Sequence, residues 1–165
     1  MFEEEIDQES WQIREVYARF GVAIYKAQCI ETGLVNLLVA LKLKDRHKIT
    51  RADIVSFREN NYEKTLGTLI TYLKQSLDIS DDFEKELREA LEIRNYLVHH
   101  YFRVNAIDFS NKNGRIRMLS EINSFTSKLE TLDMKIDSIC LTIGEQFGIT
   151  EEMIDKIESE LLKEA

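Results

Sequence analysis

Residues 80–103, with the sequence SDDFEKELREALEIRNYLVHHYFR, decide the fold class of this chain. The stretch opens with Ser80, Asp81 and Asp82. A serine side chain can accept a hydrogen bond from a free backbone N–H at a helix start, and acidic side chains interact favourably with the positive end of a helix. Apolar residues then recur at helical spacing. They are Phe83, Leu87, Ala90, Leu91, Leu97 and Val98. The stretch therefore predicts a helix with one buried side.

The rest of the chain shows the same helical spacing of apolar residues. Its 165 residues contain no proline and only six glycines, so long helices can form without interruption. We expect helices at about 9–43, 50–77, 80–103, 116–143 and 150–165. Asn60 and Asn61 are the candidate break in the second helical region, and residues 108–114 form the clearest turn. The sequence predicts an all-α single domain over residues 1–165, an up-and-down helical bundle of four main helices with its core at about 9–147, plus a short C-terminal helix.

The net charge of the chain is −8 at neutral pH. Proteins that coat nucleic acid depend on a broad basic surface, because contacts to phosphate dominate their affinity. The acidic balance excludes that class, so a phosphate ligand needs a local positive site or help from a partner. The basic connector at about 42–51 could guide RNA, although a solvated loop is the simpler interpretation.

The sequence also restricts the compartment and the kind of chemistry. Cys29 and Cys140 lie far apart without metal-ligand spacing, which favours two reduced, buried thiols. There is no run of 18 apolar residues, and Met1–Glu5 is acidic where a signal peptide would be basic. Motifs for metal, nucleotide or serine-nucleophile sites are absent from the sequence. We therefore expect a soluble, cytoplasmic protein without a membrane segment, metal or other cofactor.

The segment Arg94–Arg103 carries the most reactive side chains. It holds two of the three histidines and two arginines, with no acid. At 100° per residue in a continuous helix, Asn95 and His99 are neighbours one turn apart, and Arg94 and Tyr101 lie along one line two turns apart. Such a helix face can line a cleft with a guanidinium and an imidazole at its edges. The apolar residues between them are Leu91, Val98 and Phe102.

The spacing Arg-x4-His-x-Tyr, formed by Arg94, His99 and Tyr101 with Asn95 after the arginine, resembles the active-site motif of HEPN-domain ribonucleases. The resemblance covers residues 9 to about 147, and its specific part is the ten-residue segment. It implies a HEPN-like helical domain and a metal-independent, toxin-like endoribonuclease, with a stress or defence role. It also implies a homodimer in which two motif helices face each other across a cleft.

The same resemblance implies a role for each motif residue. His99 would act as general base or acid on the ribose 2′-hydroxyl, and the ordinary histidine pKa of about 6.5 suits that task. Arg94 would hold the scissile phosphate of an RNA substrate, and Asn95 would orient His99 or a phosphate oxygen. Tyr101 occupies the position that a nucleotidyltransferase-type antitoxin partner modifies in one branch of the family.

Other interpretations of these residues stay open at the level of sequence. The chain could be a non-catalytic HEPN-like module that binds nucleotide, RNA or a partner protein, or a purely structural helical adaptor. His99 and His100 could cap the end of the helix, and Arg94 could pair with Glu92 or with an acid on another helix. Tyr101 could be a core aromatic residue. Glu31 is a candidate carboxylate for orienting His99, with surface exposure as the alternative.

Overall fold

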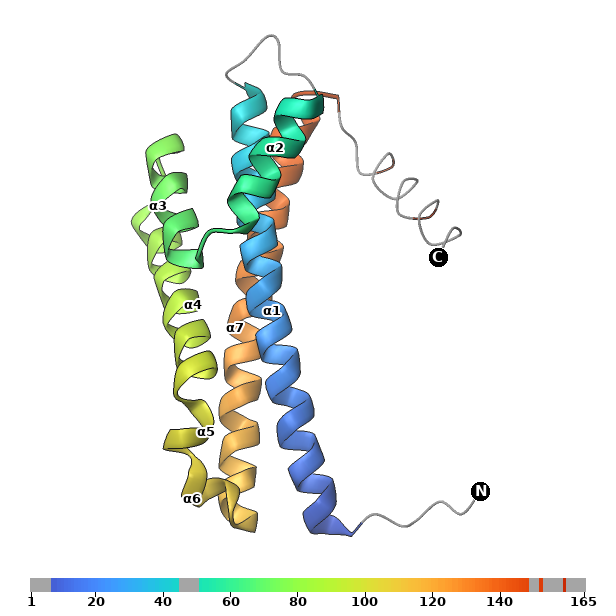
Figure 1. The fold of residues 1–165 in the computed structure, drawn as a ribbon, viewed down its shortest axis with the longest axis vertical. Helices are drawn as coiled ribbons and strands as arrows, with labels where there is room; N and C mark the ends of the chain where they lie inside the picture. The colour runs from blue at the N-terminus through green and yellow to red at the C-terminus, as the bar shows by residue number, and fades with distance from the viewer. Residues whose placement is uncertain (1–6, 45–50, 149–151, 153–158, 160–165) are drawn as a thin grey trace. The chain divides into compact units, whose positions relative to one another are not determined.

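The computed structural model describes residues 7–44, 51–148, 152 and 159, and the elements within these residues are all α-helices (Figure 1). The all-α prediction is confirmed. The C-terminal helix expected at about 150–165 lies, apart from residues 152 and 159, outside the described residues. The described helices are α1 (Gln8–Lys44), α2 (Arg51–Tyr62), α3 (Leu66–Ser76), α4 (Asp81–His99), α5 (Tyr101–Val104), α6 (Ala106–Phe109) and α7 (Lys112–Glu145).

Polar side chains cap the starts of three helices. The Asp7 carboxylate accepts a hydrogen bond from the backbone N–H of Ser10 at 3.0 Å and begins α1. The Ser80 hydroxyl accepts from the backbone N–H of Phe83 at 3.3 Å, so the cap expected from the sequence is present. Thr65 plays the same part at the start of α3. This third cap explains why the second predicted helical region is two helices, separated a few residues after the candidate break.

The helix that carries the motif ends earlier than the sequence predicts. The backbone of His100, at φ −131° and ψ −27°, is not helical, and the short helices α5 and α6 follow it. The geometry of a continuous helix, which places Arg94 and Tyr101 along one line, therefore does not extend across His100. The predicted turn at 108–114 contains the end of α6 and the start of α7.

The chain divides into two compact units, and both take part of α1 and of α7. The first contains the described residues up to Ile30 together with Ser80–Leu132, and the second contains Glu31–Ile79 and the described residues from Asp133 onward. Each unit has its own apolar core. Core side chains of the first unit include Val16, Ala23, Ala27, Phe83, Leu87, Leu97, Met118, Ile122 and Leu129. Those of the second include Leu34, Leu37, Leu38, Leu66, Leu69, Leu73 and Ile136.

A buried arginine, Arg115, fixes the start of α7 within the first unit. Arg115 is only 3% exposed, and its Nε donates to Oε1 of the buried Gln12 at 3.1 Å. Its Nη1 donates to the carbonyl of Phe109 at 3.0 Å, and its Nη2 lies 3.4 Å from the Glu9 carboxylate. A buried guanidinium is tolerated only when its donors are satisfied in this way. Arg115 therefore joins α1, the end of α6 and α7.

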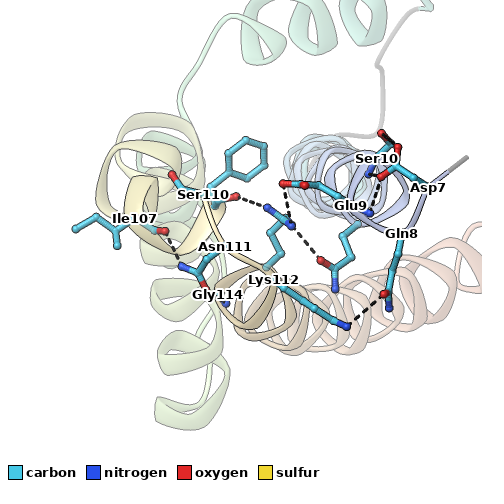
Figure 2. Close-up of polar contacts among 12 residues, drawn as sticks. Asp7, Gln8, Glu9, Ser10, Ile107, Ser110, Asn111, Lys112 and Gly114 are labelled. Carbon is cyan, nitrogen blue, oxygen red and sulfur yellow. Dashed lines mark hydrogen bonds and ion pairs between the residues drawn. The ribbon is translucent and has the colours of Figure 1, made fainter.

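A glycine makes the same corner sterically feasible. A Cβ atom added at Gly114 would lie 2.1 Å from the backbone carbonyl oxygen of Asp108, closer than any side chain could tolerate. The Gly114 N–H donates to the side-chain oxygen of Asn111 at 2.8 Å, and the Asn111 side chain in turn donates to the carbonyl of Ile107 (Figure 2). Only glycine allows α7 to begin this close to α6.

Among the described residues, α1 is the one helix that length and composition alone would allow to cross a membrane, over Gln8–Lys42. Core helices of soluble proteins pass the same test. Nearly half of the apolar window, 44%, is buried inside the protein. The feature is therefore weak support for a membrane segment.

Candidate functional site

The motif lies at the C-terminal end of α4 and in α5, within the first unit. One side of α4 packs into the core, and Leu97 and Tyr101 continue that buried side. Asn95 and His99, one turn apart, are both exposed, as their i, i+4 spacing predicts for one helix face. Arg94 is half-buried at the boundary between the two sides.

Arg94 and Asn95 contact each other directly. Nη1 of Arg94 donates to Oδ1 of Asn95 at 3.3 Å. The bond directs the amide oxygen of Asn95 toward the guanidinium, so the NH2 group is the donor that Asn95 can offer to a ligand. Guanidinium and amide donors together suit a phosphate oxygen, which is an acceptor. The structure therefore brings two of the three predicted catalytic residues into one polar group, with His99 one turn further along α4.

His99 has another imidazole beside it. The ring centroids of His99 and His100 are 6.1 Å apart, and both side chains are exposed. Arg103, in α5, places Nη2 2.9 Å from Nδ1 of His100. Because arginine has donors only, Nδ1 of His100 must be the acceptor, and Nε2 of that neutral ring must carry the proton. The His100–Arg103 pair, whose partners are three residues apart, was not predicted from the sequence.

Tyr101 lies in the core. Its side chain is 1% exposed, and its hydroxyl donates to the backbone carbonyl of Met118 at 3.1 Å. Burial, with a smaller contribution from the nearby Glu121 carboxylate, raises the pKa of the Tyr101 phenol far above its ordinary value. Tyr101 is therefore a core aromatic residue, one of the two interpretations that the sequence left open. In this conformation its hydroxyl does not face solvent, so modification would require the ring to leave the core.

Aromatic side chains from α1 adjoin the motif. The Phe102 ring lies 4.9 Å from the Phe20 ring and 5.5 Å from the Tyr17 ring, both measured between centroids. The sequence predicts Val98 on the buried side of its helix, but Val98 is 47% exposed, so this prediction is wrong; Tyr17 is 53% exposed. We name the exposed apolar side chains of the motif segment and of the α1 residue that contacts it the α1–α4 apolar face. They are Val98, in α4, and Tyr17, in α1, whose ring contacts that of the half-buried Phe102.

Several other candidates from the sequence lie outside α4 and α5, or are not described. The basic connector lies mostly outside the described residues; within them, Lys42 Nζ lies 4.0 Å from the centre of the Phe57 ring. Glu31 belongs to the second unit and is half-buried. Cys29 and Cys140 are unpaired thiols that are half-buried, and burial raises the pKa of Cys140 to about 11.

A groove on the other edge of α4 is separate from the motif. It has a volume of about 260 Å³ and lies between α4 and α7 in the first unit. Ala90, Ile93 and Leu129 are among its apolar lining residues, and an ion pair between Glu89 and Lys128 stands at its rim. In the described parts of the chain, no group of three or more His, Cys, Asp and Glu side chains could hold a metal ion.

Comparisons with known proteins add no family to this geometry. No family model, curated protein or solved structure matches the chain. The likeness to HEPN ribonucleases therefore rests on the motif residues Arg94, Asn95, His99 and Tyr101 and on the helices that carry them.

Proposed function

We propose that the protein is a metal-independent endoribonuclease of HEPN type that acts as a homodimer, in the cytoplasm, with a toxin-like or stress-related role. The observation that carries the proposal is the contact between Arg94 and Asn95, with the exposed imidazole of His99 one turn away on the same helix. This set offers phosphate donors and a proton acceptor without any carboxylate in the segment. The bundle of four main helices expected for such a domain is part of the same proposal.

The proposed reaction is an internal phosphoryl transfer. The neutral His99 imidazole takes the proton of the ribose 2′-hydroxyl, and that oxygen attacks the adjacent phosphorus. The bond from phosphorus to the 5′-oxygen of the next nucleotide breaks, and this oxygen receives a proton from the imidazolium of His99 in the second copy. Arg94 donates to the non-bridging oxygens as their charge grows. The products are a 2′,3′-cyclic phosphate and a 5′-hydroxyl.

A second copy is needed because the chain is acidic as a whole. The α1–α4 apolar face lies beside the motif, and a symmetric contact there would cover its exposed side chains. Two copies would place two Arg94 and two His99 side chains around one phosphate. That local charge would offset the repulsion of RNA by a chain with a net charge of −8.

The direct test is RNA cleavage in EDTA by the purified protein. Loss of a general acid–base group costs about 10²- to 10⁴-fold in rate, so His99→Ala is expected to reduce cleavage by at least that factor. Asn123→Ala, at an exposed position of α7, is the matched control and should cut like the wild type. Circular dichroism should show both variants folded. Cleavage by His99→Ala at the wild-type rate would exclude the assignment.

The alternative function is a non-catalytic module that binds nucleotide, RNA or a partner protein. The α1–α4 apolar face favours it, because apolar side chains that are exposed beside a polar site commonly mark a binding surface. RNA binding that depends on Arg94, with no cleavage product under any condition, would identify this function. A nucleotidyltransferase-type partner acting on Tyr101 belongs to the toxin proposal and would have to draw the ring out of the core.

A further inference from the structure

Arg103 differs from other arginines of the first unit in its bonding partner. Arg88, Arg115 and Arg117 each pair with a carboxylate, from Glu84, Glu9 and Asp108 respectively. The guanidinium of Arg103 instead bonds to the neutral ring of His100. Within the described residues no carboxylate neutralises it.

The sequence on either side of His100 and Arg103 contains no acidic residue. Residues 93–107 have neither Asp nor Glu, and the first acid beyond them, Asp108, is engaged by Arg117 through two hydrogen bonds of 2.6 and 3.2 Å. His100 and Arg103 are both exposed. In a chain of net charge −8, an exposed cation without a carboxylate partner is a local site for an anion.

We propose that His100 and Arg103 form a second phosphate-binding subsite, which holds a phosphate of the RNA chain next to the one at Arg94, Asn95 and His99. This inference rests on the proposed function and names the substrate as an RNA oligomer rather than a mononucleotide. The pair offers the remaining guanidinium N–H groups and the Nε2–H of His100, all of them donors for phosphate oxygens.

The geometry makes the subsite depend on the length of the ligand. The rings of His99 and His100 are 6.1 Å apart between centroids, so a chain with repeated phosphates can contact both groups at once. A mononucleotide that occupies the first site leaves the second empty. The carbonyl groups at the C-terminal end of α4 disfavour an anion, so binding at the subsite must come from the side chains. Removal of Arg103 should therefore abolish most of it.

The experiment measures binding of a fluorescent single-stranded RNA oligomer at several salt concentrations, in a His99→Ala background that prevents cleavage. Adding Arg103→Ala should weaken oligomer binding about 10-fold at low salt and reduce the slope of log K against log salt by about 0.7, the value for one phosphate contact on a single strand. Binding of a nucleoside 3′-monophosphate should not change. Arg88→Ala, which removes one positive charge from α4, is the matched control and should leave the slope unchanged.

Each contrary outcome overturns the subsite. Absence of oligomer binding, an unchanged salt slope in Arg103→Ala, or an equal loss in Arg88→Ala would each do so, and so would an equal loss for the mononucleotide. The same dependence on Arg103 with a polyglutamate peptide would show that the pair recognises negative charge rather than phosphate. Failure of the proposed function is separate, since a wild-type protein that never cuts RNA can still show the Arg103-dependent slope.

Discussion

At the scale of single residues, three arginines differ in burial and in hydrogen-bond partners, and these differences determine which of them a ligand can reach. Arg115 is buried and fully engaged, and it holds three segments of the first unit together. Arg94 is half-buried and bonded to Asn95, whereas Arg103 is exposed and bonded to an imidazole. Only the last two have the exposure that a phosphate ligand requires. Burial thus separates the structural Arg115 from Arg94 and Arg103, the two arginines proposed to bind phosphate.

Tyr101 gives a prediction about pH. Its pKa is raised in the folded protein, so the folded state holds its proton more tightly than the unfolded chain does. Its contribution to stability is fully present below pH 10, the ordinary tyrosine value, and is lost as the pH rises further. Tyr101→Phe should cost about 1 kcal/mol at pH 7, through the lost bond to the Met118 carbonyl. Above pH 10 the difference between wild type and variant should shrink by up to about 1.4 kcal/mol per pH unit.

Urea unfolding followed by circular dichroism between pH 7 and pH 11 measures this difference. Other groups that titrate in this range, such as the Cys140 thiol, are present in both proteins, so their effect cancels in the comparison. If the difference in the free energy of unfolding between wild type and Tyr101→Phe stayed constant with pH, the raised pKa of Tyr101 in the folded protein would be contradicted.

At the scale of helices, the caps and apolar spacings predicted most of the described elements. Ser80 predicted the start of α4, and the buried Phe83 and Leu87 follow it at the expected spacing. The rotation of each helix was harder to predict. Leu97 and Val98 are adjacent apolar residues, and only packing against other helices decides that Leu97 is buried and Val98 is exposed. Ile116, an apolar residue near the start of α7, is 50% exposed for the same reason.

Substitution of glycine by alanine should change the stability of the protein in opposite directions at two positions of these helices. Gly21 lies in α1 with open space where a Cβ would be, so Gly21→Ala should stabilise the monomer by about 1 kcal/mol through helix propensity. Gly114→Ala forces a Cβ against the backbone of Asp108 and should destabilise the protein by about 3 kcal/mol or more. Thermal and urea unfolding of both variants provide the test. Equal effects at the two positions would contradict the described start of α7.

At the scale of the whole molecule, contacts between distant segments set the candidate site and could not be read from local patterns. The motif residues Arg94, Asn95 and His99 are local, so the sequence could identify them. The buried hydroxyl of Tyr101 donates to the carbonyl of Met118, 17 residues later in the chain. Arg115 donates to Gln12, 103 residues earlier. Periodicity carries no information about such pairs. It also gave no reason to expect the non-helical backbone of His100, which ends α4 before Tyr101.

The proposed dimer gives a prediction for the whole assembly. Val98→Glu places a charge on the α1–α4 apolar face and should convert a dimer to a monomer and abolish RNA cleavage, because a buried unpaired charge opposes association. Ile116→Glu is the matched control, since Ile116 is equally exposed but lies on α7. Sedimentation velocity over a range of concentrations measures the oligomeric state. A Val98→Glu protein that remains dimeric and active would place the dimer contact elsewhere.

The hydrogen bond from Tyr101 to Met118 has a consequence for any enzyme that acts on the tyrosine. A group attached to the phenol oxygen replaces the proton that is donated to the Met118 carbonyl. The Tyr101 side chain is only 1% exposed, so the packed core around its oxygen has no room for that group. Modification and the native packing of α5 against α7 are therefore mutually exclusive. The modified chain would be marked by faster cleavage with proteases near α5, so that silencing and degradation would proceed from one chemical event.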